Sequence, residues 1–170
     1  MKITEKNGSL SIADFDEVDA YKIACRIEKD GIGFYSRLSQ GQKDKKAKEA
    51  IDFLITEEQK HLNLFEKFVA DVRARLDKEK NENEDLLASI DYGIFWPYQN
   101  MKNLDELMQD VRLAFKLAVL VEDKSISFYK LCAEQVSVPD VKAELLKIVE
   151  EEDKHKKLFM KLLDKCDGKK

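Results

Sequence analysis

The chain has 170 residues, a charged fraction of 38%, a net charge of −4, and only six glycines and two prolines. This composition is typical of long helices and the length allows one sizeable core, so we expect a single all-α domain over residues 1–170. Acidic and basic side chains are interleaved, and no apolar stretch reaches the roughly 18 residues of a membrane span, which predicts a cytoplasmic protein without nucleic-acid or membrane partners.

Apolar side chains recur at alternating spacings of three and four residues in four segments, the periodicity of helices that share a core. The predicted helices cover residues of about 14–40, 44–79, 104–135 and 140–166. Short links join the first helix to the second and the third to the fourth, whereas the segment between the second and third is longer and contains Pro97. This order of connections predicts an antiparallel four-helix bundle with one long crossover between helices 2 and 3.

The second helix pair repeats the first at a constant offset of 94 residues. The offset relates three pairs of polar residues: Glu28 and Glu122, Glu58 and Glu152, and His61 and His155. A duplicated helix hairpin explains this better than chance. Two such hairpins packed about a pseudo-twofold axis would bring equivalent residues face to face.

The core-facing stripe of each helix, called its seam below, is apolar apart from these six polar residues. Each E-x-x-H pair projects from one helix face, because its members are one turn apart. Two carboxylates about 4 Å apart repel by roughly 4 kcal/mol at an effective dielectric constant near 20, whereas four carboxylates and two neutral imidazoles balance two divalent cations. A lone seam glutamate or histidine is more often structural, but the doubled set predicts a dinuclear metal site with the ligands Glu28, Glu58, His61, Glu122, Glu152 and His155.

The donor types indicate the metal. A carboxylate-rich site with one nitrogen per metal suits iron or manganese better than the sulfur-bearing sites of structural zinc. We expect two iron ions, because the Fe(II)/Fe(III) couple makes the site useful, with manganese or a mixed pair as alternatives.

Two tyrosines and four charged residues lie near the motifs. Tyr35 and Tyr129, two turns beyond Glu28 and Glu122, are candidates for a catalytic hydrogen bond or electron relay, or for packing alone. The charged neighbours fall off the seam and are interpreted as solvated: Glu57, Lys60, Glu151 and Lys154.

The segments "IEKDGIGFY", "EEQKH", "VEDKSISFY" and "EEDKH" resemble the four metal-binding helices of rubrerythrin-type diiron proteins in the ferritin-like superfamily. The resemblance covers residues of about 14–166. It implies that Glu58 and Glu152 bridge two irons, and that the terminal ligands are Glu28 with His61 and Glu122 with His155.

Two departures from that family stand out. No C-x-x-C pair is present, so we expect no rubredoxin domain and an external electron donor, such as a rubredoxin-type protein. Ser125 stands where the family carries an additional glutamate ligand, which leaves six protein ligands instead of seven.

The predicted function is that of a non-haem diiron oxidoreductase of peroxidase or ferroxidase type, which reduces hydrogen peroxide or O2 in the response to oxidative stress. The resemblance also implies a homodimer. Two alternatives remain open: a metal-binding or partner-interaction bundle whose dinuclear site is structural, and an iron-storage subunit.

Overall fold

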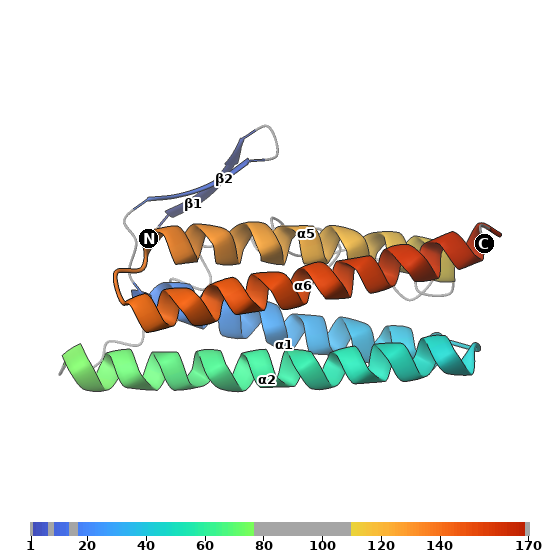
Figure 1. Ribbon diagram of the computed structural model, residues 1–170, viewed down its shortest axis with the longest axis horizontal. Coiled ribbons are helices and arrows are strands. Elements are labelled where there is room, and N and C mark those ends of the chain that lie inside the picture. Colours follow the sequence, from blue (N-terminus) through green and yellow to red (C-terminus); the bar gives the residue numbers. More distant parts are fainter. Residues whose placement is uncertain (1, 7–8, 14–16, 77–109, 169–170) are drawn as a thin grey trace.

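The computed structural model describes residues 2–6, 9–13, 17–76 and 110–168. Its main body is a bundle of four helices, which Figure 1 shows as two hairpins laid against each other. The helices are α1 (Glu17–Gly41), α2 (Lys45–Leu76), α5 (Val111–Gln135) and α6 (Pro139–Cys166). The predicted four-helix bundle is therefore confirmed. None of these helices is long and apolar enough to cross a membrane.

The helices pair as a duplicated hairpin predicts. Each packs mainly against its neighbour in sequence, α1 against α2 and α5 against α6. The two hairpins meet through α1 with α5 and through α2 with α6. α2 ends and α5 begins at opposite ends of the bundle (Figure 1), as the predicted long crossover between them requires. The residues of this crossover, 77–109, lie outside the described part of the chain.

Three residues explain where the helices begin. Asp44 accepts a hydrogen bond of 2.8 Å from a backbone N–H in the first turn of α2. Asp110 has an extended backbone and accepts a hydrogen bond of 3.1 Å from the N–H of Leu113. Such a side chain caps a helix by satisfying one of its unpaired N–H groups, so α5 begins directly after Asp110. Pro139 opens α6, where a missing N–H costs nothing.

A short β-hairpin precedes the bundle and was not predicted. Strand β1 (Lys2–Lys6) pairs antiparallel with β2 (Ser9–Ala13), and β2 lies against α5. The register joins Lys6 to Ser9, which leaves two residues between the strands.

The core lies between the two hairpins and is rich in aromatic rings. Among the described residues, the largest fully buried side chains include Tyr21, Tyr35, Phe65, Phe115, Phe128, Tyr129 and Phe159. In the described part of the chain, eight polar or charged residues are also buried: Glu28, Ser39, Glu58, His61, Glu122, Ser125, Glu152 and His155. Six of these are the predicted metal ligands, and they are a costly group to bury without countercharge.

Candidate metal centre

One polar cluster in the middle of the bundle receives side chains from all four helices. α1 and α5 each supply one glutamate, while α2 and α6 each supply a glutamate and, one turn later, a histidine. The structure brings all six predicted ligands together, each at most 7% exposed: Glu28, Glu58, His61, Glu122, Glu152 and His155. Burial of the apolar seams carries these side chains inward with them.

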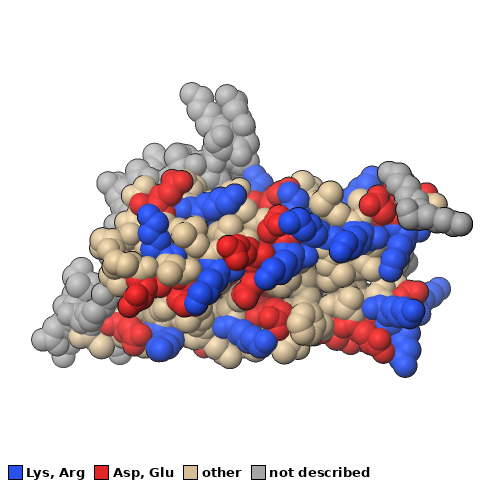
Figure 2. Space-filling model, in the orientation of Figure 1, with Lys and Arg blue, Asp and Glu red and all other residues tan. Residues whose placement is uncertain are grey.

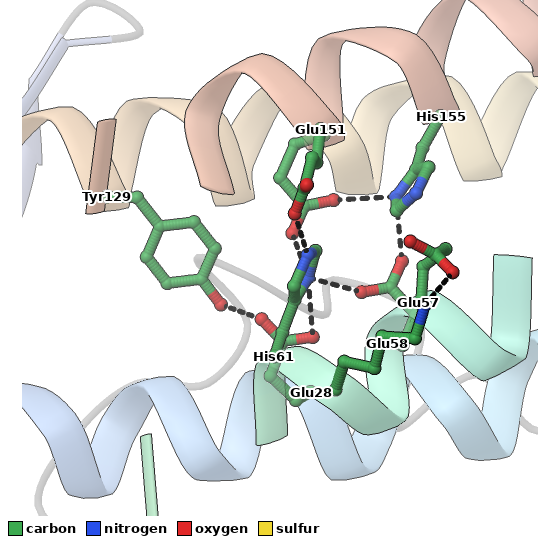
Figure 3. Close-up of polar contacts among 9 residues, drawn as sticks. Glu28, Glu57, Glu58, His61, Tyr129, Glu151 and His155 are labelled. Carbon is green, nitrogen blue, oxygen red and sulfur yellow. Dashed lines mark hydrogen bonds and ion pairs between the residues drawn. The ribbon is translucent and has the colours of Figure 1, made fainter. Parts of the chain in front are cut away.

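The glutamates of the two E-x-x-H motifs lie between the two histidines, as Figure 3 shows for Glu58. Nδ1 of His61 lies 3.2 Å from Oε2 of Glu58 and 3.3 Å from Oε1 of Glu152. Nδ1 of His155 lies 3.1 Å from the remaining oxygen of each glutamate. Each of these carboxylates therefore presents one oxygen to each histidine.

The ligand atoms form two overlapping groups. One consists of Glu28, Glu58, His61 and Glu152, and the other of Glu58, Glu122, Glu152 and His155. Within each group the donor atoms lie within 4.8 Å of one another. Three carboxylates and one imidazole are donors suited to a divalent transition metal. The cluster is thus able to hold metal, and its two groups, with two shared carboxylates, fit a metal pair.

Burial and mutual repulsion change the protonation of the glutamates. Burial, followed by the charges of Glu58 and Glu152, raises the pKa of Glu28 well above its ordinary value. Burial and the same two charges also raise the pKa of Glu122. Burial alone would raise the pKa of Glu152 too, but hydrogen bonds from both histidines outweigh it and lower that pKa. The glutamates of α1 and α5 therefore hold protons at pH values where an exposed carboxyl is ionised.

The histidines respond to the same carboxylates. Burial alone would lower the pKa of His61, but hydrogen bonds to Glu152 and Glu58 raise it to about 12. The same balance raises the pKa of His155 to about 9. Both imidazoles are positively charged at neutral pH in the metal-free protein. Protons thus supply the countercharge, and a metal has to displace them in order to bind.

The two candidate tyrosines hold the terminal glutamates across the hairpins. Tyr35 of α1 donates a hydrogen bond of 2.5 Å to Glu122 of α5. Tyr129 of α5 donates one to Glu28 of α1 (Figure 3). Both hydroxyl groups are therefore satisfied within the core. These contacts give each tyrosine a structural role. A catalytic role for either tyrosine stays a prediction.

A small cavity lies beside the carboxylates on the side of α1 and α5. Its volume is about 10 Å³, and its lining includes Gly31 and Ser125 next to the four glutamates. This is about the room that one water-sized molecule needs. Gly31 and Ser125 are equivalent in the repeat, one turn beyond Glu28 and Glu122. The two small residues leave space at a place where a longer side chain would contact the cluster.

One contact of the cluster was missed by the sequence pattern. Oε2 of Glu151, interpreted above as a solvated charge, lies 2.8 Å from Nε2 of His61 (Figure 3). Its side chain is 41% exposed, so its outer part meets solvent while its tip contacts the buried ring. Two features of the sequence could have indicated this contact. Glu151 is adjacent to the ligand candidate Glu152, and the repeat places a glutamate, Glu57, at the equivalent position.

Comparison with known proteins places the chain in a family. The model of the family described as Rubrerythrin matches residues 3–91, just over half of the chain. The matched part contains Glu28, Glu58 and His61, and the second hairpin supplies their repeat equivalents. No curated protein and no solved structure matches. The four-helix bundle with its buried Glu and His cluster therefore belongs to the Rubrerythrin family, whose domain is ferritin-like.

Proposed function

We propose that the chain is a non-haem diiron oxidoreductase that reduces hydrogen peroxide or O2, with chemistry of peroxidase or ferroxidase type. The observation that carries the proposal is the pair of overlapping donor groups with two shared carboxylates. Membership of the Rubrerythrin family, which binds non-haem iron, supports iron as the metal.

In this proposal each of the two donor groups holds one metal ion. Glu58 and Glu152 would serve both metal positions, because each presents one oxygen to each histidine. Glu28 with His61 would complete one position, and the corresponding pair on α5 and α6 the other. An iron pair would supply two electrons through the Fe(II)/Fe(III) couple, the number that reduction of peroxide to water consumes.

The surrounding residues exclude water and hold protons. Phe65 and Phe159, fully buried, stack on the rings of Tyr129 and Tyr35 at centroid distances of 5.2 and 5.3 Å. Burial raises the pKa of both tyrosine hydroxyls, with the charge of the nearest glutamate adding to the effect, so each keeps its proton next to a ligand carboxyl. The cavity beside Ser125 admits a molecule of about the size of water, which favours a small oxidant.

In this proposal the electrons come from an external donor such as a rubredoxin-type protein. A cytoplasmic location and a homodimer remain part of the proposal. Native mass spectrometry tests the assembly, and a mass far above that of a dimer would favour the iron-storage alternative instead.

Stopped-flow spectroscopy of the Fe(II)-loaded protein tests the function. We expect oxidation by peroxide or O2 to be much faster than that of free Fe(II), and Glu58→Ala to remove the acceleration. Glu49→Ala changes an exposed residue of the same helix and serves as the control. Metal that is retained but oxidised no faster than free Fe(II), in wild type and Glu58→Ala alike, would refute the proposal and favour a structural site.

A further inference from the structure

The outward-facing nitrogens of the two histidines have different surroundings. Nε2 of His61 on α2 lies 2.8 Å from Oε2 of Glu151 on α6, so this contact joins the two hairpins. For Nε2 of His155, no side-chain partner is found in the described part of the chain. The inner nitrogens are alike, since both Nδ1 atoms face the shared glutamates.

The repeat makes this difference informative, because both halves contain the same side chains. Glu57 is equivalent to Glu151, and Lys60 is equivalent to Lys154. Oε1 of Glu57 lies 2.6 Å from Nζ of Lys60 on its own helix. Figure 3 shows Glu151 reaching His61 across the cluster. One half thus directs its carboxylate to a histidine, and the other directs it to a surface lysine.

A carboxylate at the outer nitrogen changes what the inner nitrogen can do. When Nε2–H donates to a carboxylate, the proton is fixed on that nitrogen and the lone pair is left on Nδ1. The hydrogen bond also fixes the ring orientation and makes Nδ1 more basic. Loss of such a partner typically lowers metal affinity by about 10- to 100-fold. His61 has this partner, whereas none of the described residues provides one for His155.

We propose that Glu151 is a positioning residue that orients His61 and makes the two metal positions inequivalent. The position that includes Glu28 and His61 fills first, and the position that includes Glu122 and His155 fills second. The inference rests on the proposed function only in requiring that the cluster binds metal, and it is independent of any reaction with an oxidant.

Titration of the metal-free protein with Co(II) tests the order of filling, because the absorption bands of Co(II) report its coordination. We expect two binding steps in wild type. Glu151→Ala should weaken the tighter step by about 10- to 100-fold, and Glu151→Gln, which keeps a hydrogen-bond acceptor without the charge, should weaken it less. Glu57→Ala is the matched control and should change neither step by more than about twofold. Circular dichroism verifies that each variant folds.

Proton NMR of the Co(II)-loaded protein gives a second readout, because the chain has only two histidines. The Nε2–H of His61 should exchange slowly with water and that of His155 rapidly, and Glu151→Ala should remove the difference. Equal effects of Glu151→Ala and Glu57→Ala, an unchanged tighter step, or no Co(II) binding by wild type would each overturn the inference. Ordered Co(II) binding together with an inert Fe(II) form would instead refute the oxidoreductase function alone.

Discussion

Tyr35 on α1 donates a hydrogen bond to Glu122 on α5, with 2.5 Å between Oη and Oε1. Both side chains are about 1% exposed, so neither can replace this partner with bulk water. Tyr129 and Glu28 repeat the contact in the opposite direction. The two hydroxyl groups therefore tie the hairpins together at the level of the metal cluster.

Replacement of Tyr35 by phenylalanine should destabilise the metal-free protein by about 1–3 kcal/mol, since it leaves a buried carboxyl without its donor. Urea denaturation at pH 7 measures the loss. Tyr129→Phe should cost a similar amount, because the repeat gives it the same kind of partner. Lys147→Ala removes an exposed cation that pairs with Glu144, and this variant should stay within about 0.5 kcal/mol of wild type. A Tyr35→Phe variant as stable as this control would contradict the prediction.

The stability of the metal-free protein should fall as the pH rises from 6.5 to 9. The histidine pKa values of about 12 and about 9 lie above the ordinary value of 6.5, so the folded state binds more protons than the unfolded state in this window. Their contribution is complete below pH 6.5 and is lost as the pH passes the folded pKa values. The raised pKa values of Glu28 and Glu122 act in the same direction from pH 4.5 upward.

Thermal unfolding at several pH values measures this effect. A change of about 1 kcal/mol shifts the Tm of a protein of this size by about 2–4 °C, so a decrease of several degrees is expected between pH 6.5 and 9. His155→Gln should have a smaller slope. Co(II)-loaded protein should show the reverse trend, because metal displaces protons and binds better as the pH rises. A metal-free Tm that rises over this window would show that the histidines do not carry the extra protons.

Glu28→Gln should stabilise the metal-free protein at pH 8 by about 1 kcal/mol or more while weakening metal binding. Burial and the charges of Glu58 and Glu152 oppose ionisation of Glu28, and glutamine imitates its protonated form. At pH 5 the variant should differ little from wild type. Urea denaturation at both pH values, with Co(II) titration, tests the trade-off. Glu66→Gln, which changes a half-exposed residue paired with Lys29, is the control. Equal shifts at pH 5 and pH 8 would show that repulsion is not the cause.

Periodicity predicted the helices and the buried ligands because both are consequences of one seam. A glutamate such as Glu28, placed among apolar residues at helical spacing, must enter the core when its seam is buried. The N-terminal strands were missed although Leu10 and Ile12 alternate with serines in β2, because each strand is only five residues long. Apolar spacing does not show where a helix begins, and capping by Asp110 determines the start of α5.

The role of Glu151 could not be predicted for a different reason. Spacing along one helix identifies its buried face, but it does not reveal what a second helix presents to an exposed residue at the edge of that face. Glu151 and His61 are 90 residues apart in sequence and meet only because α2 packs against α6. The hydrogen bonds of Tyr35 and Tyr129 could not be predicted for the same reason, since each joins one hairpin to the other.

Ser125→Glu tests whether the cavity beside the cluster is the place of a missing ligand. Ser125 is 5% exposed and the cavity measures about 10 Å³, so a glutamate there is overpacked and adds a fifth carboxylate to four. The free energy of unfolding of the metal-free variant should fall by about 2–4 kcal/mol, because of strain and of an unpaired buried charge. Bound metal should recover part of that loss, because the new carboxylate gains a cation as its partner.

Ser125→Gln separates the two causes, because glutamine has nearly the same size and no charge. The free energy of unfolding of Ser125→Gln should fall only by the part that is due to packing. Co(II) should raise the Tm of this variant by no more than it raises the Tm of wild type. The gain in Tm on Co(II) loading should therefore be largest for Ser125→Glu. Equal gains for the two variants would mean that a side chain at position 125 does not reach the metal, and that the serine preserves space beside the cluster rather than marking a lost ligand.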